Sequence, residues 1–299
     1  MKKLILSLFT LTLSLTALGQ QAGDNFVIKT SEAGKTTEWS LAGDSKNGDI
    51  STIKHKGNQL ILYAKGYEGT EWETYDIDKI ESITFNVFHK GSYVEESAAQ
   101  AVKNMGIGTN FGNCTDVVAM WMNMNSNSVT DFEKAWGQEP TTKPMVDFLK
   151  KNGFNSVRIP VTWFQHMKAD GTVDEAWMNR IQEIVDYVID NGMYCILNIH
   201  HDTGADSDDV KHWIKADEAN YKENKEKFEY LWTQIATRFK NYDQHLVFEG
   251  YNEMLDADNT WNAPKSASSY KGLNGYAQSF VNAVRATGGN NETRNLIVN

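Results

Sequence analysis

The stretch HLVFEGYNEM, residues 245–254, carries two carboxylates at the end of an apolar run. Glu249 follows the run directly, and Glu253 stands four positions later, after Asn252. A carboxylic acid donates a proton near neutral pH when burial or a neighbouring negative charge raises its pKa. If strand alternation continues, Glu253 lies at the rim of a site and Glu249 a layer below. Glu253 is therefore the candidate proton donor, and Glu249 is predicted to be the buried partner of a cation.

Arg158 is the candidate for that cation. It stands in the apolar stretch NSVRIP, where a buried charge is costly unless it is paired. A structural ion pair with Glu249 and a functional role are compatible, because an arginine can hold a catalytic carboxylate ionised while it remains structural.

The stretch NIHHD supplies His200, His201 and Asp202, with acidic residues and His212 shortly after. Neighbouring strand residues point to opposite faces, so we do not expect the two histidines to share a metal ion. The motif His-Glu-x-x-His is absent, and Gly204 stands too early for an EF-hand loop. We expect no metal or other cofactor, and a neutral histidine that donates a hydrogen bond to a ligand hydroxyl. A metal-dependent hydrolase built on this cluster is an alternative.

Strand-like and helix-like segments alternate from about residue 93 onward. Apolar strand patterns occur at residues 105–112, 155–160, 193–199, 245–251 and 294–299. Helical patterns occur at residues 141–153, 174–192, 224–240 and 269–289. Two of these helices are predicted to bury one face each, through Trp177, Ile181, Ile184, Val185 and Val188 and through Phe228, Leu231, Trp232, Ile235 and Phe239.

This alternation predicts a parallel sheet, which a barrel and a doubly wound sheet both contain. No G-x-G-x-x-G loop follows the first strand, whereas polar residues gather where successive strands end. In a (β/α)8 barrel those ends converge on one face, which holds the active site. The α/β pattern therefore favours the N-terminal part of a (β/α)8 TIM barrel, with about five strands.

The first 92 residues differ from the rest. Residues 1–19 have two lysines, a short apolar run and a small-residue end, which is typical of a secretory signal peptide. Residues 20–92 contain short β-rich runs between Gly, Asp, Asn and Lys clusters, which predict a small all-β module. Its role is open: an exposed Trp72 would suit a carbohydrate-binding module, and a spacer is the alternative. Residues 93–299 form the third segment.

The amino-acid composition limits the kinds of binding partner and the cellular location that we expect for this protein. The 299 residues carry a net charge of -10, which repels polyanions, so no nucleic acid partner is expected. The 9 Trp and 12 Tyr suit a protein that stacks flat, neutral sugars. No cysteine follows the apolar leader, so we expect no membrane anchor and a secreted or periplasmic protein. Cys195 lies in an apolar strand pattern and is predicted to be a buried free thiol.

Four stretches together resemble glycoside hydrolase family 5, the retaining endoglucanases with a (β/α)8 fold. They are GIGTNFGNCTD, AWGQEPTTKPMVDFLKKNGFNSVRIPVTW, MYCILNIHHD and LVFEGYNEM, in the order of the family and from about residue 104 to 299. The resemblance is closest to subfamily 4. It implies a secreted enzyme that cleaves internal β-1,4-glucosidic bonds in cellulose, β-glucan or xyloglucan.

The resemblance also implies roles for individual residues. It assigns the acid/base to Glu253. The substrate-binding residues that it implies are Asn252, for the sugar 2-hydroxyl, with Arg158, His200, His201, Asn113 and Trp261. The segment Cys114–Asp116 departs from the usual Thr-Leu-Asp, which leaves the sugar contacts there open.

The nucleophile of the family is a second glutamate after a later strand, and we expect it to lie outside this chain. Two catalytic carboxyls of a retaining enzyme stand about 5 to 5.5 Å apart. Residues 249 and 253 of one continuous strand would be about 13 Å apart. A truncated, non-catalytic carbohydrate-binding or scaffold protein is the alternative.

Overall fold

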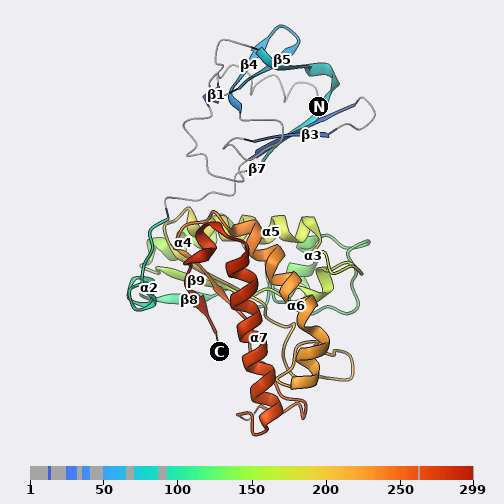
Figure 1. Cartoon of the computed structure of the whole chain (residues 1–299), viewed down its shortest axis with the longest axis vertical. Coiled ribbons are helices and arrows are strands. Elements are labelled where there is room, and N and C mark those ends of the chain that lie inside the picture. The colour runs from blue at the N-terminus through green and yellow to red at the C-terminus, as the bar shows by residue number, and fades with distance from the viewer. Residues whose placement is uncertain are drawn as a thin grey trace. The chain divides into compact units, whose positions relative to one another are not determined.

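The computed structural model describes residues 13–14, 25–31, 36–40, 50–64, 71–86, 93–261 and 263–298. The chain divides into two compact units, residues 1–89 and 90–299, and each is described by itself (Figure 1). Among the described residues, no helix is both long and apolar enough to span a membrane.

The first unit is built from antiparallel strands, as predicted. One sheet has the order β1-β4-β5-β6 and the other β3-β2-β7. The strands are β1 (Leu13–Ser14), β2 (Asn25–Thr30), β3 (Thr36–Ser40), β4 (Ile50–Lys56), β5 (Gln59–Ala64), β6 (Glu71–Asp76) and β7 (Ile80–Asn86), with a 3-10 turn at Ile77–Lys79. Gly57 turns the β4–β5 hairpin with a φ of 61°, which glycine adopts without strain.

Apolar side chains from several strands form a small core in this unit. Its buried members are Ile28, Ile50, Ile53, Leu60 and Leu62. The predicted signal peptide lies outside the described residues except for β1, which pairs with β4. Trp72 falls in β6, but its side chain is outside the part that the structure describes, so its stacking role stays a prediction.

The second unit contains a five-stranded parallel sheet of order β12-β11-β10-β9-β8. Its strands are β8 (Gly108–Asn110), β9 (Ser156–Ile159), β10 (Tyr194–Asn198), β11 (Leu246–Glu249) and β12 (Leu296–Ile297). Spatial order follows chain order without reversal, whereas a doubly wound sheet reverses at its switch point. The sequential order matches the strands of a (β/α)8 barrel, as expected.

Helices connect these strands, and most were expected. They are α2 (Ala98–Met105), α3 (Val129–Lys134), α4 (Lys143–Lys151), α5 (Glu175–Ile189), α6 (Glu218–Phe239) and α7 (Ala267–Ala286), with 3-10 turns η3 (Phe164–His166) and η4 (Gly289–Glu292). The short α2 and α3 were not predicted. Ser97 caps the first and Ser128 the second, where Asp131 completes a capping box.

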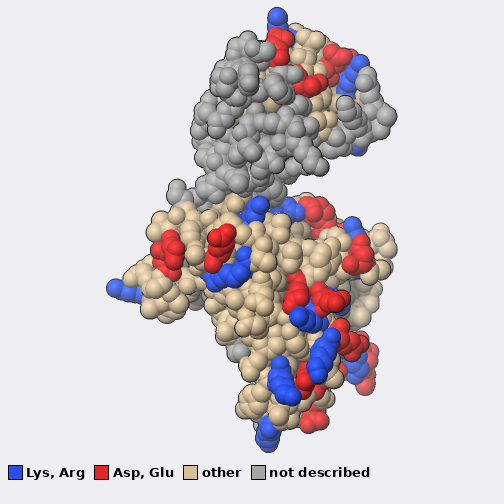
Figure 2. Space-filling model, in the orientation of Figure 1, with Lys and Arg blue, Asp and Glu red and all other residues tan. Residues whose placement is uncertain are grey.

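The long helices bury the faces that the sequence predicted. All five predicted residues of α5 and all five of α6 are at most 1% exposed. Figure 1 shows α6 and α7 running side by side. On the face drawn in Figure 2, acidic and basic side chains are interspersed. Between α6 and α7, Lys222 and Lys271 both pair with Glu218.

The loop after β11 begins under tight packing. At Gly250 a Cβ would stand 2.8 Å from the Phe280 ring, so a larger residue would force the chain away from α7. Trp232 of α6 donates its indole N–H to the Gly250 carbonyl at 3.1 Å. The contacts of Gly250 with Phe280 and Trp232 fix the strand end that carries polar residues.

Cys195 in β10 is a buried free thiol, as predicted.

Candidate active site

The core of the site is an ion pair across the sheet. Arg158 of β9 donates from Nε to Glu249 Oε2 at 2.6 Å and from Nη2 to Oε1 at 2.9 Å. The Glu249 side chain is 8% exposed and that of Arg158 is 25% exposed. Two parallel charge-assisted hydrogen bonds make this the strong, bidentate kind of pair. The prediction that Glu249 is the buried partner of Arg158 is confirmed.

The same guanidinium also holds two side-chain amides, one at the end of β8 and one just after β11. Its Nη1 donates to Asn110 Oδ1 at 3.0 Å, and its Nη2 donates to Asn252 Oδ1 at 3.0 Å. Arg158 of β9 therefore ties the end of β8, at Asn110, to the residues at and just after the end of β11. Because the Asn252 oxygen accepts from Arg158, the Asn252 amide nitrogen is left as the donor toward a ligand.

Glu253 lies one residue beyond Asn252 and is exposed. The expectation that strand alternation carries from Glu249 to Glu253 is wrong, because β11 ends at Glu249. The backbone still hydrogen-bonds to its neighbours at Gly250 and Asn252, and the chain bends at Asn252, so one continuous strand does not reach Glu253. Tyr251 between them packs into the core. Glu253 makes no hydrogen bond or ion pair with the residues that the structure describes.

His200 and His201 lie together with Asp116, contrary to prediction. His200 Nε2 is 3.9 Å and His201 Nε2 is 3.7 Å from Asp116 Oδ2. The rule of opposite faces fails here because β10 ends at Asn198, and His201 lies in a turn. Both imidazoles therefore reach the same carboxylate.

Backbone amides hold the Asp116 carboxylate in place. Its Oδ1 accepts from the Cys114 N–H at 3.1 Å, and the Asn113 N–H also hydrogen-bonds the carboxylate. Asn113 has a φ of 67°, the left-handed conformation that asparagine tolerates better than most residues. The Asn113 side chain is exposed. Asn113 thus shapes the site at least through its backbone, by aiming Asp116 at the histidines.

Burial keeps both imidazoles neutral. It lowers the pKa of His200 to about 3, with further lowering by His201 and Arg158. It lowers the pKa of His201 to about 4, with a contribution from His212. At neutral pH each ring therefore offers one N–H donor and one acceptor nitrogen.

Asn198, which the sequence analysis did not single out, connects the ion pair to His200. It is fully buried at the end of β10. Its Nδ2 lies 3.0 Å from His200 Nδ1 and 3.4 Å from Glu249 Oε2, and its Oδ1 accepts from the Val161 N–H at 3.1 Å. An asparagine at a strand end carries no distinctive sequence signal, and its partners are far away along the chain.

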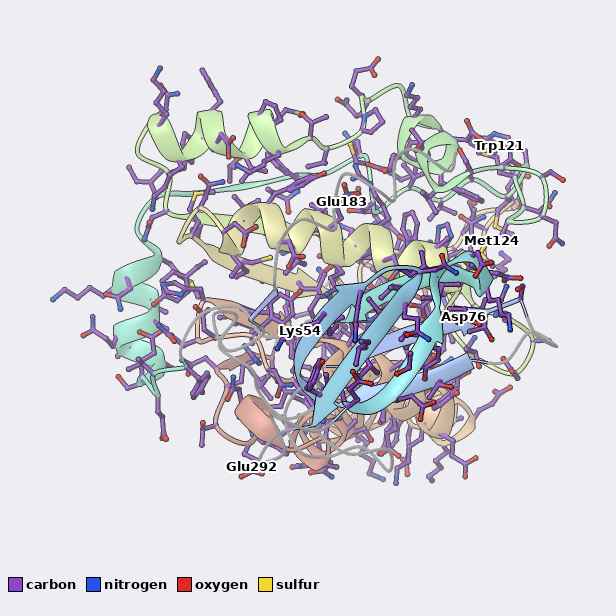
Figure 3. The ribbon with its side chains drawn as sticks, turned by 90° about the horizontal axis from the view of Figure 1, so that it is seen from above. Lys54, Asp76, Trp121, Met124, Glu183 and Glu292 are labelled. Atoms are coloured by element: carbon purple, nitrogen blue, oxygen red, sulfur yellow. The ribbon has the colours of Figure 1, made fainter. Side chains whose placement is uncertain are left out.

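Three tryptophans stand in the segments that connect strands and helices, and Trp136 is the one that follows α3. The Trp136 ring lies 5.6 Å from the His201 ring, between centroids, and its indole N–H donates to Val118 O. Trp121 is 71% exposed and projects from the loop between β8 and α3 (Figure 3). Trp261, predicted as a stacking platform, is 65% exposed in the loop between β11 and α7. Trp136 and Trp121 were not singled out from the sequence.

Asp116, His200 and His201 are the one group in the described part of the chain whose ligand atoms could jointly hold a metal ion. These atoms lie within 4.8 Å of one another. Asp202 does not extend the group, because its buried carboxylate already accepts from the Trp163 and Phe164 amides and from the Trp213 indole. The acidic stretch after it adds no further ligand to the group.

The arrangement combines hydrogen-bond donors, one fixed carboxylate acceptor and exposed indole rings. Neutral hydroxylated ligands are bound by such combinations, since each hydroxyl both donates and accepts. The carboxyl group of Glu253 beside Asn252 adds a group capable of proton transfer. The geometry therefore fits a sugar-binding site with an acid at its edge.

Comparisons with known proteins point the same way. A family model described as cellulase, glycosyl hydrolase family 5, matches residues 113–299. Endoglucanase B of Clostridium cellulovorans is 40% identical over 209 residues, which cover 68% of this chain and 42% of that protein.

Two solved structures are also similar. A glycoside hydrolase family 5 enzyme of Prevotella bryantii, in complex with a xyloglucan tetradecasaccharide, is 56% identical with a TM-score of 0.65. The match covers 69% of this chain and 57% of that one. A GH5-4 broad specificity endoglucanase of Ruminococcus champanellensis with bound cellotriose is 42% identical with a TM-score of 0.62, over 69% of this chain and 58% of that one. The chain thus spans less than two thirds of the length of each of these relatives.

Proposed function

The chain belongs to the cellulase family, glycosyl hydrolase family 5, and on that premise we propose that it serves in a secreted endo-β-1,4-glucanase. Glu253 protonates the leaving glycosidic oxygen and later activates water, as the acid/base of a retaining mechanism requires. The observation that carries the proposal is the bond from Arg158 Nη2 to Asn252 Oδ1. It fixes the residue next to Glu253 with its amide nitrogen free to donate to a sugar hydroxyl.

Glu249 does not serve as the second carboxylate. Its side chain is only 8% exposed, and both of its oxygens accept from Arg158, at 2.6 and 2.9 Å, which fits a structural partner of the arginine and not a group presented to a sugar. As the resemblance to the family implies, we propose that the nucleophile is a second glutamate outside residues 1–299. Arg158 acts as a support that keeps Glu249 and Asn252 in position.

The proposed substrate is a β-1,4-linked glucan, such as cellulose, mixed-linkage β-glucan or xyloglucan. The imidazoles of His200 and His201 donate hydrogen bonds to sugar hydroxyls, and the Asp116 carboxylate accepts hydrogen bonds from sugar hydroxyls. The indole ring of Trp136 or Trp261 provides a face on which a sugar ring stacks. The oligosaccharides in the two solved relatives support this substrate class. The apolar leader at residues 1–19 supports export.

Polysaccharide hydrolysis by the full-length gene product tests the proposal. Endo-cleavage predicts that the viscosity of β-glucan and xyloglucan solutions falls early, while few reducing ends have formed. The variant Glu226→Gln, on the exposed face of α6, is the matched control for a Glu253→Gln variant and should keep full activity. Binding of cello-oligosaccharides without release of reducing ends would instead support the non-catalytic carbohydrate-binding alternative.

A further inference from the structure

Asn198 lies between the ion pair and His200 and takes no part in the proposal above. Its side chain is completely buried, and each of its two polar atoms faces a partner. Oδ1 is 3.1 Å from the Val161 backbone nitrogen, which can only donate. Nδ2 is 3.4 Å from Glu249 Oε2, which accepts as a carboxylate. These two contacts leave one orientation for the amide.

That orientation determines the hydrogen on His200. The Asn198 Nδ2 atom lies 3.0 Å from His200 Nδ1, and an amide NH2 group has no lone pair to offer. His200 Nδ1 must therefore accept. In a neutral imidazole the hydrogen then sits on Nε2, the atom that faces Asp116 Oδ2 at 3.9 Å.

We infer that Asn198 is a positioning residue that selects the Nε2–H tautomer of His200 and so makes that imidazole a hydrogen-bond donor at the sugar site. The inference rests on the proposed function for its bearing on hydrolysis, but not for the tautomer itself. The gap of 3.9 Å between donor and acceptor is too long for a direct hydrogen bond. A ligand hydroxyl placed between them would accept from His200 and donate to Asp116.

The Arg158–Glu249 pair also belongs to the chain of hydrogen bonds that orients the His200 imidazole. Arg158 fixes Glu249, Glu249 orients the Asn198 amide, and the amide orients the imidazole. The charge pair therefore acts on the ligand-facing nitrogen through two hydrogen bonds, without touching the ligand there.

Nitrogen-15 NMR of the histidine rings tests the tautomer directly. In the unmodified protein at neutral pH, the His200 signals, assigned with His200→Gln, should show a protonated Nε2 and an unprotonated Nδ1. His245 is an internal reference for a protonated Nδ1, because its Nδ1 faces Asp243 Oδ1 at 3.1 Å. A hydrogen on His200 Nδ1 in the unmodified protein would overturn the inference, whatever the variants do.

A second test measures the His200 tautomer by the same NMR experiment in the isosteric variant Asn198→Asp. An ionised carboxylate at this position accepts from Nδ1, so at a pH high enough to ionise it beside Glu249 the His200 tautomer should switch while the His245 signals stay unchanged. An unchanged His200 tautomer in a folded Asn198→Asp protein would contradict the inference.

Kinetics separate this inference from the proposed function. Asn198→Asp should lower kcat/KM on β-glucan, and in the His200→Ala background it should cause no further loss beyond about twofold, because both changes remove one donor. Additive losses would show that Asn198 acts structurally and not through His200. A tautomer switch with unchanged kcat/KM would leave the positioning role in place and remove His200 from the proposed sugar site.

Discussion

Arg158 binds Glu249 with both ends of its guanidinium fork, at 2.6 and 2.9 Å, and shares Nη2 with Asn252. One side chain thus holds a buried carboxylate and the residue before the proposed acid. Lysine offers a point charge in place of the planar fork and cannot reproduce these contacts. The stability of the strand ends and the geometry of the site are therefore linked through Arg158.

Glu249→Gln should destabilise the second unit by about 3 kcal/mol, because it leaves the largely buried Arg158 charge without its partner. Urea unfolding followed by tryptophan fluorescence measures the loss. Replacing both residues with methionine should recover at least half of it, since no unpaired charge then remains.

The exposed pair Lys143–Asp147, with nitrogen and oxygen 2.6 Å apart, provides the matched control. Lys143→Gln should leave the urea midpoint almost unchanged, because solvent-exposed pairs contribute little. If Glu249→Gln were as mild as Lys143→Gln, the pair would not be a structural element of the site.

Acid should destabilise the second unit through His166. This ring stacks on Trp177 with centroids 3.6 Å apart, and burial lowers its pKa to about 3. The unfolded chain then binds a proton below its usual pKa of about 6.5 and the native state does not, so stability falls as pH falls through that window. Between about pH 7.5 and pH 5 the loss from this group is about 2 kcal/mol.

The variant His166→Phe should remove that share of the pH dependence, as urea titrations at the two pH values would measure. His245→Gln is the contrasting control. Its hydrogen bond to Asp243 raises the pKa of His245, so this group stabilises the fold below its usual pKa and the contribution is lost as pH rises. A His166→Phe protein with an unchanged pH dependence would refute the assignment.

Chelators should leave β-glucan hydrolysis unchanged. Asp116, His200 and His201 have ligand atoms within 4.8 Å, but Asn198 favours a hydrogen on His200 Nε2, which zinc would have to displace. The measurement is the rate after dialysis against a chelator, with and without added zinc. Loss of activity that zinc restores would favour the metal-dependent hydrolase over the two-carboxylate mechanism.

Trp136→Ala should raise KM about tenfold on cello-oligosaccharides with little change in kcat, because a stacking ring binds ground state and transition state alike. Trp136→Phe keeps a ring and should retain part of the affinity. Steady-state kinetics on a series of chain lengths measures both effects. A lower kcat with unchanged KM would assign Trp136 to the reacting centre instead.

Long amphipathic helices and apolar strands were predictable because burial imposes a period on the sequence. The five positions predicted to face the core in α5 are all buried and illustrate this. The helices α2 and α3 were not predicted from the sequence, because each buries only one or two residues and depends on its serine cap. Their formation rests on local hydrogen bonds more than on a hydrophobic stripe.

The site was predictable where a charge had to be neutralised. Arg158 inside an apolar strand required a partner, and Glu249 was the acidic residue in an equivalent position. The grouping of His200 with His201 was not predictable, because it depends on β10 ending two residues earlier. Asn198 was missed because its function lies in contacts with residues 37 and 51 positions away.

The central claim is that Glu253 is the proton donor, and leaving-group dependence tests it most directly. In the full-length protein, Glu253→Gln should lower kcat/KM by about 10²- to 10⁴-fold on aryl β-cellobiosides with poor leaving groups. Aryl β-cellobiosides with highly acidic leaving phenols need no protonation of the leaving group, so the rate of their bond-breaking step should fall little in this variant. An equal loss across the whole series, or unchanged turnover of the poor leaving groups, would contradict the account.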